Sequence, residues 1–200
     1  MRLLRVVCLG SVVAVVLAAC AAAGVPVTSN PGTKVQEAIV LVDQQGRPFP
    51  AEKLIVEAIQ EYKSAGDDNG LADAYRAYGL FFRSRTLANA SYAAHYREKG
   101  FLDRDASYDA RYDRSLYYFT MARKLYGAAG KDDLLSNVEF HIGDVNVLKG
   151  DTAAACSAYE DALKTQALFR QRNPTASVDT GTHDSFEAAV HASMLHAGCK

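Results

Sequence analysis

A pattern that occurs twice, 64 residues apart, constrains the fold of this chain more than any other feature of its sequence. Each copy holds an apolar run that ends in glycine, then an aspartate, then a second apolar run with a glycine inside it. A glycine after an apolar helical run ends a helix, and an aspartate just beyond it caps the next one. The matched pairs are Ala58 and Ala122, Tyr62 and Tyr126, Ala65 and Ala129, Gly66 and Gly130, Asp68 and Asp132, Leu71 and Leu135, and Gly79 and Gly143. The repeat therefore predicts the same two successive helices twice.

The rest of the chain also favours helices. No proline occurs between Ala51 and Asn173, so nothing in that span interrupts long helices. Apolar residues recur there at helical spacing, and glycine and proline in the segment 45–50 predict a break. The expected helices are 34–45, 51–65, 71–84, 106–127, 131–149, 151–172 and 183–196. We predict an all-α domain.

The segment 137–165 predicts two helices folded back on each other. Small residues lie where the two backbones approach closely, and an aromatic residue fills the space above them. These residues are Ile142, Gly143, Ala155, Tyr159 and Ala162, and with Gly79 they resemble the packing positions of a tetratricopeptide (TPR) unit. The resemblance implies a short α-solenoid of irregular TPR-like antiparallel helix pairs, closed by a C-terminal capping helix over 183–196.

The segment from Arg83 to Asp105 does not fit a regular array. A TPR unit has a period of about 34 residues, and the observed spacing of 64 is shorter than two such units. Counted from Gly79, a standard unit places its second-helix small residue at Ser91 and its aromatic at His95. The segment is either a degenerate helix pair or an insertion between good helices, and the sequence leaves both interpretations open.

The first residues predict a leader. Arg2 and Arg5 precede an apolar run over 6–19 that is too short to span a bilayer comfortably. Leu17-Ala18-Ala19-Cys20 resembles the bacterial lipobox, which implies cleavage before Cys20 and acylation of that residue. The alternative is an ordinary secretory leader in which Cys20 is incidental.

The lipobox resemblance also implies a location and a domain plan. Two or more acyl chains anchor a protein stably to a membrane, and Ala21 rather than aspartate after the cysteine implies sorting to the outer membrane, facing the periplasm. The expected division is a signal peptide over 1–19, a flexible tether over 20–33 and a TPR-like helical domain over 34–200.

Two cysteines lie in the body of the chain. Cys156 is near the start of one expected helix and Cys199 is just after the end of the next. If those helices pack antiparallel, the two thiols meet, and an exported protein can form the disulfide. The alternative is that Cys156 is a small buried residue.

Aromatic residues gather in the middle third of the chain, with arginines among them. One interpretation is core and interhelix packing. The other is a partner-binding surface, since tyrosine and arginine dominate binding hot spots. The candidate residues for that surface are Arg83, Arg85, Tyr92, Tyr96 and Arg97.

The composition argues against several function classes. A net charge of −1 does not suit nucleic acid. No nucleophile motif, phosphate loop or dinucleotide fingerprint is present, and the spacing of His183, His191 and His196 does not make a ligand pair on one helix face. We expect no metal, no cofactor and no enzymatic activity.

The TPR and lipobox resemblances together imply an adaptor or assembly factor that binds another envelope protein or peptide. The alternative is a small-ligand or cell-wall-fragment binding lipoprotein that uses a pocket lined by aromatic residues and arginine. The identity of the partner is not readable from the sequence.

Overall fold

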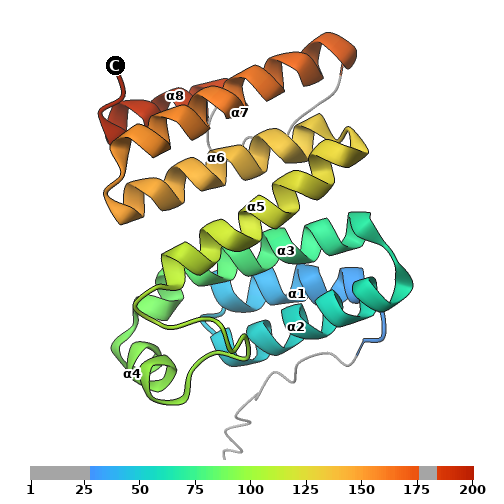
Figure 1. Cartoon of the computed structure of the whole chain (residues 1–200), viewed down its shortest axis with the longest axis vertical. Coiled ribbons are helices and arrows are strands. Elements are labelled where there is room, and N and C mark those ends of the chain that lie inside the picture. The colour runs from blue at the N-terminus through green and yellow to red at the C-terminus, as the bar shows by residue number, and fades with distance from the viewer. Residues whose placement is uncertain (1–27, 176–183) are drawn as a thin grey trace, which may run out of the picture.

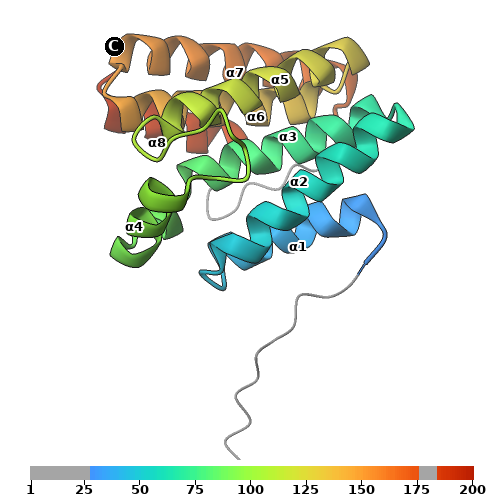
Figure 2. The same cartoon turned by 60° about the horizontal axis from the view of Figure 1, so that its bottom comes forward.

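The computed structural model describes residues 28–175 and 184–200, and within them the chain is entirely α-helical. Successive helices pack as antiparallel pairs that stack in chain order along the long axis of the molecule (Figure 1, Figure 2). The helices are α1 (Pro31–Asp43), α2 (Pro48–Ala65), α3 (Asp68–Arg83), the short 3-10 helix η1 (Arg85–Ala88), α4 (Ala90–Lys99), α5 (Arg111–Ala129), α6 (Asp132–Lys149), α7 (Thr152–Arg172) and α8 (Phe186–Ala197). The prediction of an all-α domain is confirmed for these residues.

Two helices begin earlier than the sequence predicted because their first turns contain proline. The expected break over 45–50 is wrong in its second half, since Pro48 and Pro50 lie in the first turn of α2. A proline costs no hydrogen bond there, because the first N–H groups of a helix have no partner within it. Likewise α1 begins at Pro31, after Asn30, whose side chain accepts a hydrogen bond from the Thr33 N–H at 3.0 Å.

The sequence repeat corresponds to a structural repeat. Gly66 ends α2 and Gly130 ends α5 with φ angles of +67° and +66°, a left-handed conformation that other residues rarely adopt. Further along, Gly79 of α3 lies against the ring of Phe119, and Gly143 of α6 lies against the ring of Tyr159. Each glycine thus allows a close approach between the two helices of a pair, α3 with α5 and α6 with α7.

The irregular segment is an insertion between the two helices of the α3–α5 pair. Ser115 of α5 donates a hydrogen bond to the carbonyl of Gly79 at 2.7 Å, and it precedes Phe119 as Ala155 precedes Tyr159. Gly79 and Ser115 are 36 positions apart, whereas Gly143 and Ala155 are 12 apart, so the first pair holds 24 additional residues.

The insertion corrects two expectations. Ser91 and His95 do not pack against Gly79. They lie on the exposed side of α4, which occupies the insertion beside α2 and α3 (Figure 1). The helix expected from Ala106 begins only at Arg111, because Tyr108 turns inward and its hydroxyl donates to the carbonyl of Leu87 at 3.0 Å.

The core has a large part and a small part. The large part fills the space among α1, α2, α3, α5, one face of α6 and the insertion, and it is rich in rings such as Tyr78, Phe82 and Phe101. The small part joins α6, α7 and α8 around Tyr159 and Phe186. A disulfide between Cys156 and Cys199, with 5.6 Å between their Cα atoms, links α7 to the residue that follows α8.

Candidate functional site

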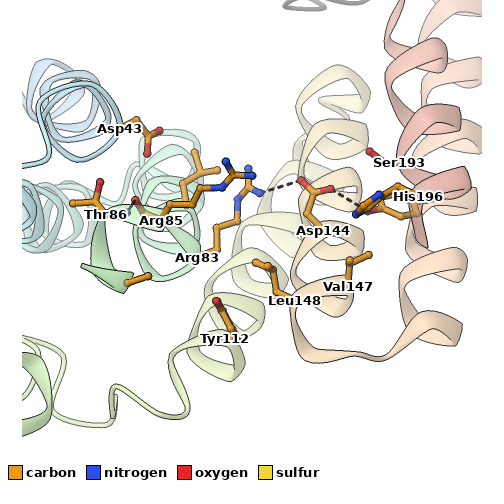
Figure 3. Close-up of a pocket in the computed structure, with 14 residues that line it drawn as sticks. Asp43, Arg83, Arg85, Thr86, Tyr112, Asp144, Val147, Leu148, Ser193 and His196 are labelled. Carbon is orange, nitrogen blue, oxygen red and sulfur yellow. Dashed lines mark hydrogen bonds and ion pairs between the residues drawn. The ribbon is translucent and has the colours of Figure 1, made fainter. Parts of the chain in front are cut away.

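A groove of about 600 Å³ runs along one side of the stacked pairs (Figure 3). It is built mainly by the first helix of each pair and by η1, so it joins segments that are far apart in the sequence. Its lining includes Asp43 of α1, Leu80 and Arg83 of α3, Arg85 and Thr86 of η1, Asp144, Val147 and Leu148 of α6, and Ser193 and His196 of α8. Acidic, basic, hydroxyl and apolar side chains therefore line the same groove.

A polar network lies at the centre of this groove. Arg83 of α3 donates to Asp144 of α6 at 3.0 Å (Figure 3). The second amino group of Arg83 lies 3.2 Å from Nδ1 of His141. Asp144 also accepts a hydrogen bond from the Tyr159 hydroxyl at 3.0 Å. Burial lowers the pKa of His141 to about 4, although the neighbouring Asp144 opposes that shift. The imidazole is therefore neutral at pH 7, and the charges of the network are one guanidinium and one carboxylate.

The η1 side of the groove carries an exposed arginine. Arg85 lines the groove and has no ion-pair or hydrogen-bond partner among the described residues. Its neighbour Thr86 donates from its hydroxyl to the carbonyl of Val42 at 2.7 Å, which fixes η1 against α1. Ser193 and His196 face the groove from α8 on the opposite side (Figure 3). The groove therefore presents one unpaired cation to a bound molecule.

The structure divides the five residues proposed as a partner-binding surface. Arg83 and Arg85 lie in the groove. Tyr92, Tyr96 and Arg97 belong to α4, on another part of the molecule. Tyr96 is only 2% exposed and its ring stacks on Phe101, which is a core position rather than a surface one. Arg97 lies over the Tyr108 ring at 4.4 Å, and the Tyr92 hydroxyl donates to the carbonyl of Gly46 at 2.8 Å.

Sequence reasoning missed most residues of the groove. Asp144, Leu148, Ser193 and His196 were not among the candidates, and no local motif marks them. One signal was present: Asp144 directly follows the close-packing Gly143, so its helix position next to a neighbouring pair could have been expected. The remaining residues depend on how α6 and α8 are rotated against their neighbours.

A second, smaller pocket of about 480 Å³ lies between the start of α2 and the insertion. Phe49, Tyr96 and Phe101 line it, together with the carboxyl group of Glu52. Glu52 is 3% exposed, and its Oε1 accepts hydrogen bonds from the Tyr78 hydroxyl at 3.0 Å and the Leu102 N–H at 2.7 Å. Burial raises the pKa of Glu52 to about 7.

Residues 28–175 and 184–200 contain no group of three or more histidine, cysteine or acidic side chains placed to hold a metal ion. None of the described helices is both long and apolar enough to cross a membrane. Cys20, the residue expected to be acylated, and the signal peptide lie outside the described residues.

No protein-family model matches the chain, and no curated protein or solved structure is significantly similar to it.

Proposed function

We propose that this protein is an outer-membrane lipoprotein, anchored through Cys20 and facing the periplasm, whose TPR-like helical array binds a segment of another envelope protein. It acts as an adaptor or assembly factor for an envelope machine and carries out no catalysis. The binding site is the groove, and the partner lies in it as an extended segment.

Internal packing supports the TPR-like description. Gly79 and Gly143 each meet an aromatic ring of the paired helix, and each pair has a small buried residue four positions before that ring, Ser115 or Ala155. Both pairs make this glycine–ring contact, although the segment between the contacting residues is 24 residues longer in the first pair. The two pairs are therefore copies of one helix pair. Stacked copies of a helix pair bury a continuous core and leave an extended surface along one side.

The single observation that carries the proposal is the composition of the groove from successive units. The side chains of α3, α6 and α8 face the same space although 113 residues separate Arg83 from His196. A site built this way suits a chain segment that contacts several units in turn. Apolar residues such as Leu148, which is 48% exposed, alternate there with polar ones such as Ser193.

The lipid anchor is supported by the leader sequence. The positive residues, the apolar run and Leu17-Ala18-Ala19-Cys20 occur in the order that the lipobox resemblance requires. An anchored adaptor meets its partner at the membrane, where tethering raises the effective concentration of the binding site.

Site-specific photo-crosslinking in cells tests the proposal. A photoreactive residue at Leu148 or Ser193, both in the groove, should give crosslinked envelope proteins that mass spectrometry identifies. The matched control is Lys124, which is exposed on α5 and lies outside the groove. Identical crosslinks from all three positions, or none from the groove positions, would reject groove binding.

A second variant tests the unpaired cation. Arg85→Glu should weaken the Leu148 crosslink while leaving the melting temperature unchanged, because Arg85 has no partner to lose. The Cys20→Ser variant should leave the protein unanchored after cell fractionation, and an unchanged membrane fraction would reject lipidation at that residue.

The alternative, a small-ligand binding protein, has one observation in its favour. The pocket beside Glu52 is separate from the groove, and it is lined by aromatic rings and by Arg104.

A further inference from the structure

The pocket beside Glu52 exists only because of the insertion. One wall comes from the first turns of α2, with Phe49, Glu52 and Lys53, and the other comes from α4 and the loop after it, 95–104. The α6–α7 pair is joined by a short turn at Gly150 and has no segment that corresponds to this second wall. The additional 24 residues of the α3–α5 pair thus create a pocket that the helix stack does not need.

The floor of the pocket holds two buried polar groups. Glu52 is 3% exposed, and both hydrogen bonds that its carboxyl group accepts end on Oε1. Tyr96 is 2% exposed, and its hydroxyl lies close enough to Glu52 for each group to shift the pKa of the other, but the contact does not have the geometry of a hydrogen bond. A buried hydroxyl without a partner is costly, so a ligand that bonds to it would be favoured.

The walls of the pocket are aromatic. The ring of Phe49 lies 4.4 Å from that of His95 and 5.5 Å from that of Tyr96, and Tyr96 stacks on Phe101 at 4.3 Å. Phe49 itself is 42% exposed at the entrance. Aromatic faces beside a carboxyl group favour an organic ammonium, which binds to both.

The rim of the pocket carries positive charges, whereas its floor holds the carboxyl group of Glu52. Lys53, Lys99 and Arg104 line it, and Glu52 is the only acidic residue among the lining residues described. Each lysine has an acidic neighbour, Glu57 at 3.8 Å or Glu98 at 2.6 Å. Arg104 is exposed and has no ion-pair partner in the described part of the chain. An ammonium alone would be repelled at this entrance, whereas a molecule that also carries an acid group would be attracted.

From this polarity we infer that the pocket binds a small zwitterion, an α-amino acid with an apolar side chain. Its ammonium group lies on the floor against Glu52 and the Tyr96 hydroxyl, its apolar side chain packs on Phe49 and Phe101, and its carboxylate binds Arg104. A volume of about 480 Å³ is adequate for such a ligand.

Binding is coupled to proton release. The ionisable groups around Glu52 are Tyr78 of α3, Tyr96 and His95 of α4, and the cations at the rim, and the backbone N–H of Asp103 also faces its carboxyl group. In the empty pocket burial raises the pKa of Glu52 to about 7, so the carboxyl group is largely protonated at pH 6. An ammonium beside it favours the carboxylate, and the displaced proton passes to the buffer.

Calorimetric titration of the full chain tests the inference. L-Phenylalanine and L-leucine should bind at pH 6 with release of nearly one proton, measured as a difference in heat between buffers of different ionisation enthalpy. N-Acetyl-L-phenylalanine lacks the ammonium and should bind at least about tenfold more weakly, since it leaves the buried groups unpaired. Absence of heat with both amino acids at millimolar concentration, or equal affinity for the acetylated compound, would overturn the inference.

Two variants assign the ends of the ligand. Arg104→Ala should weaken L-phenylalanine binding about tenfold, whereas L-phenylalanine amide, a cation without a carboxylate that Arg104 repels, should bind no more weakly to the variant. Lys124→Ala, which removes an exposed cation outside the pocket, is the charge-matched control and should change neither affinity. Glu52→Gln should abolish the proton release. Equal affinities in Arg104→Ala and Lys124→Ala would contradict the predicted orientation. None of these results depends on the groove.

Discussion

The α3–α5 and α6–α7 pairs make the same helix contact, but only the first is interrupted. Gly79 meets Phe119 after an excursion of 24 additional residues, and Gly143 meets Tyr159 after a short turn at Gly150. The insertion lies at the end of the hairpin where α3 is connected to α5, and the entropy cost of closing a loop rises only slowly with its length. The comparison shows that close packing along the helices, and not the connection, determines how a pair docks.

The segments attached to the two pairs, α8 and the insertion, are held in place by different interactions. The small core around α7 and α8 is fastened by the Cys156–Cys199 disulfide. The insertion is fastened by polar contacts, among them the Leu102 N–H on Glu52 and the ion pair between Asp103 and Arg114. One region depends on a covalent link and the other on buried hydrogen bonds, so the two should respond to different conditions.

The largest expected effect comes from removing the disulfide. The double variant Cys156→Ser and Cys199→Ser frees a loop of 43 residues, which should lower the free energy of unfolding by about 4 kcal/mol. Urea denaturation measures this loss. Hydrogen exchange should show that α8 loses more protection than α4. Equal losses in both helices would mean that the disulfide stabilises the whole molecule instead of its C-terminal end.

Glu52 should make the insertion less stable at high pH. Burial raises the pKa of this carboxyl group from 4.5 to about 7, so the folded state binds its proton more tightly than the unfolded state. The stabilisation is complete below pH 4.5 and is lost as pH rises through 7, by up to about 3 kcal/mol. Unfolding free energies at pH 5 and pH 8 measure it, and Glu52→Gln should remove this part of the pH dependence. Unchanged pH dependence in that variant would exclude Glu52 as its source.

His141 should give the α6 region the opposite pH dependence. Burial lowers the pKa of its imidazole from 6.5 to about 4, so the folded state favours the neutral ring. This contribution is complete above pH 6.5 and is lost as pH falls towards 4, by up to about 3 kcal/mol. NMR titration of the imidazole measures the pKa directly. An ordinary value near 6.5 would show that the ring is hydrated in solution.

The helices of this protein were readable from its sequence because their signals are local. Helical spacing, the turn glycines and the aspartate after Gly66 identified every long helix, and boundary errors lie at Pro31, Pro48 and Ala106. The two proline errors are local, because proline fits the first turn of a helix. The error at Ala106 depends on a contact between distant residues, Tyr108 with Leu87.

The partner of Gly79 was not found, although its signal was present. Ser115, Phe119 and Ala122 have the same spacing as Ala155, Tyr159 and Ala162. A standard TPR period counted from Gly79 predicts Ser91 and His95 instead. The groove was even harder to predict from the sequence. The contact between Arg83 and Asp144 depends on how α3 and α6 are rotated about their axes, which no local pattern encodes.

A graded effect is expected for the two close-packing glycines. A Cβ at Gly143 would lie 2.3 Å from Cε1 of the buried Tyr159 ring, and one at Gly79 would lie 2.8 Å from the Phe119 ring. We expect Gly143→Ala to cost about 2 kcal/mol and Gly79→Ala about 1 kcal/mol, because both rings are fixed by their neighbours. Gly127→Ala is the control: no atom lies within 4 Å of its Cβ, so helix propensity should stabilise it by up to about 1 kcal/mol. Stabilisation by all three would show that the rings move freely.

The smallest effects come from the ion pairs. Arg83 and Asp144 join α3 to α6, and their side chains are 26% and 21% exposed. The second ion pair joins Arg97 of α4 to Asp109, just before α5, and these side chains are 56% and 79% exposed. Water screens the second pair more completely, so double-mutant cycles in alanine should give coupling energies of about 1 kcal/mol for the first pair and about 0.3 kcal/mol for the second.

The cycle is needed because single variants mislead here. Arg97→Ala also removes the guanidinium stacked on Tyr108, and Asp144→Ala also removes the acceptor of the Tyr159 hydroxyl. Each of those losses cancels within its own cycle and leaves the pairwise term. If the Arg83–Asp144 coupling is no larger than the exposed one, apolar packing alone holds the two units in register. If it is larger, the same pair that fixes the centre of the groove also fixes the stacking of α3 against α6, and a ligand that competes for Arg83 would loosen that stacking.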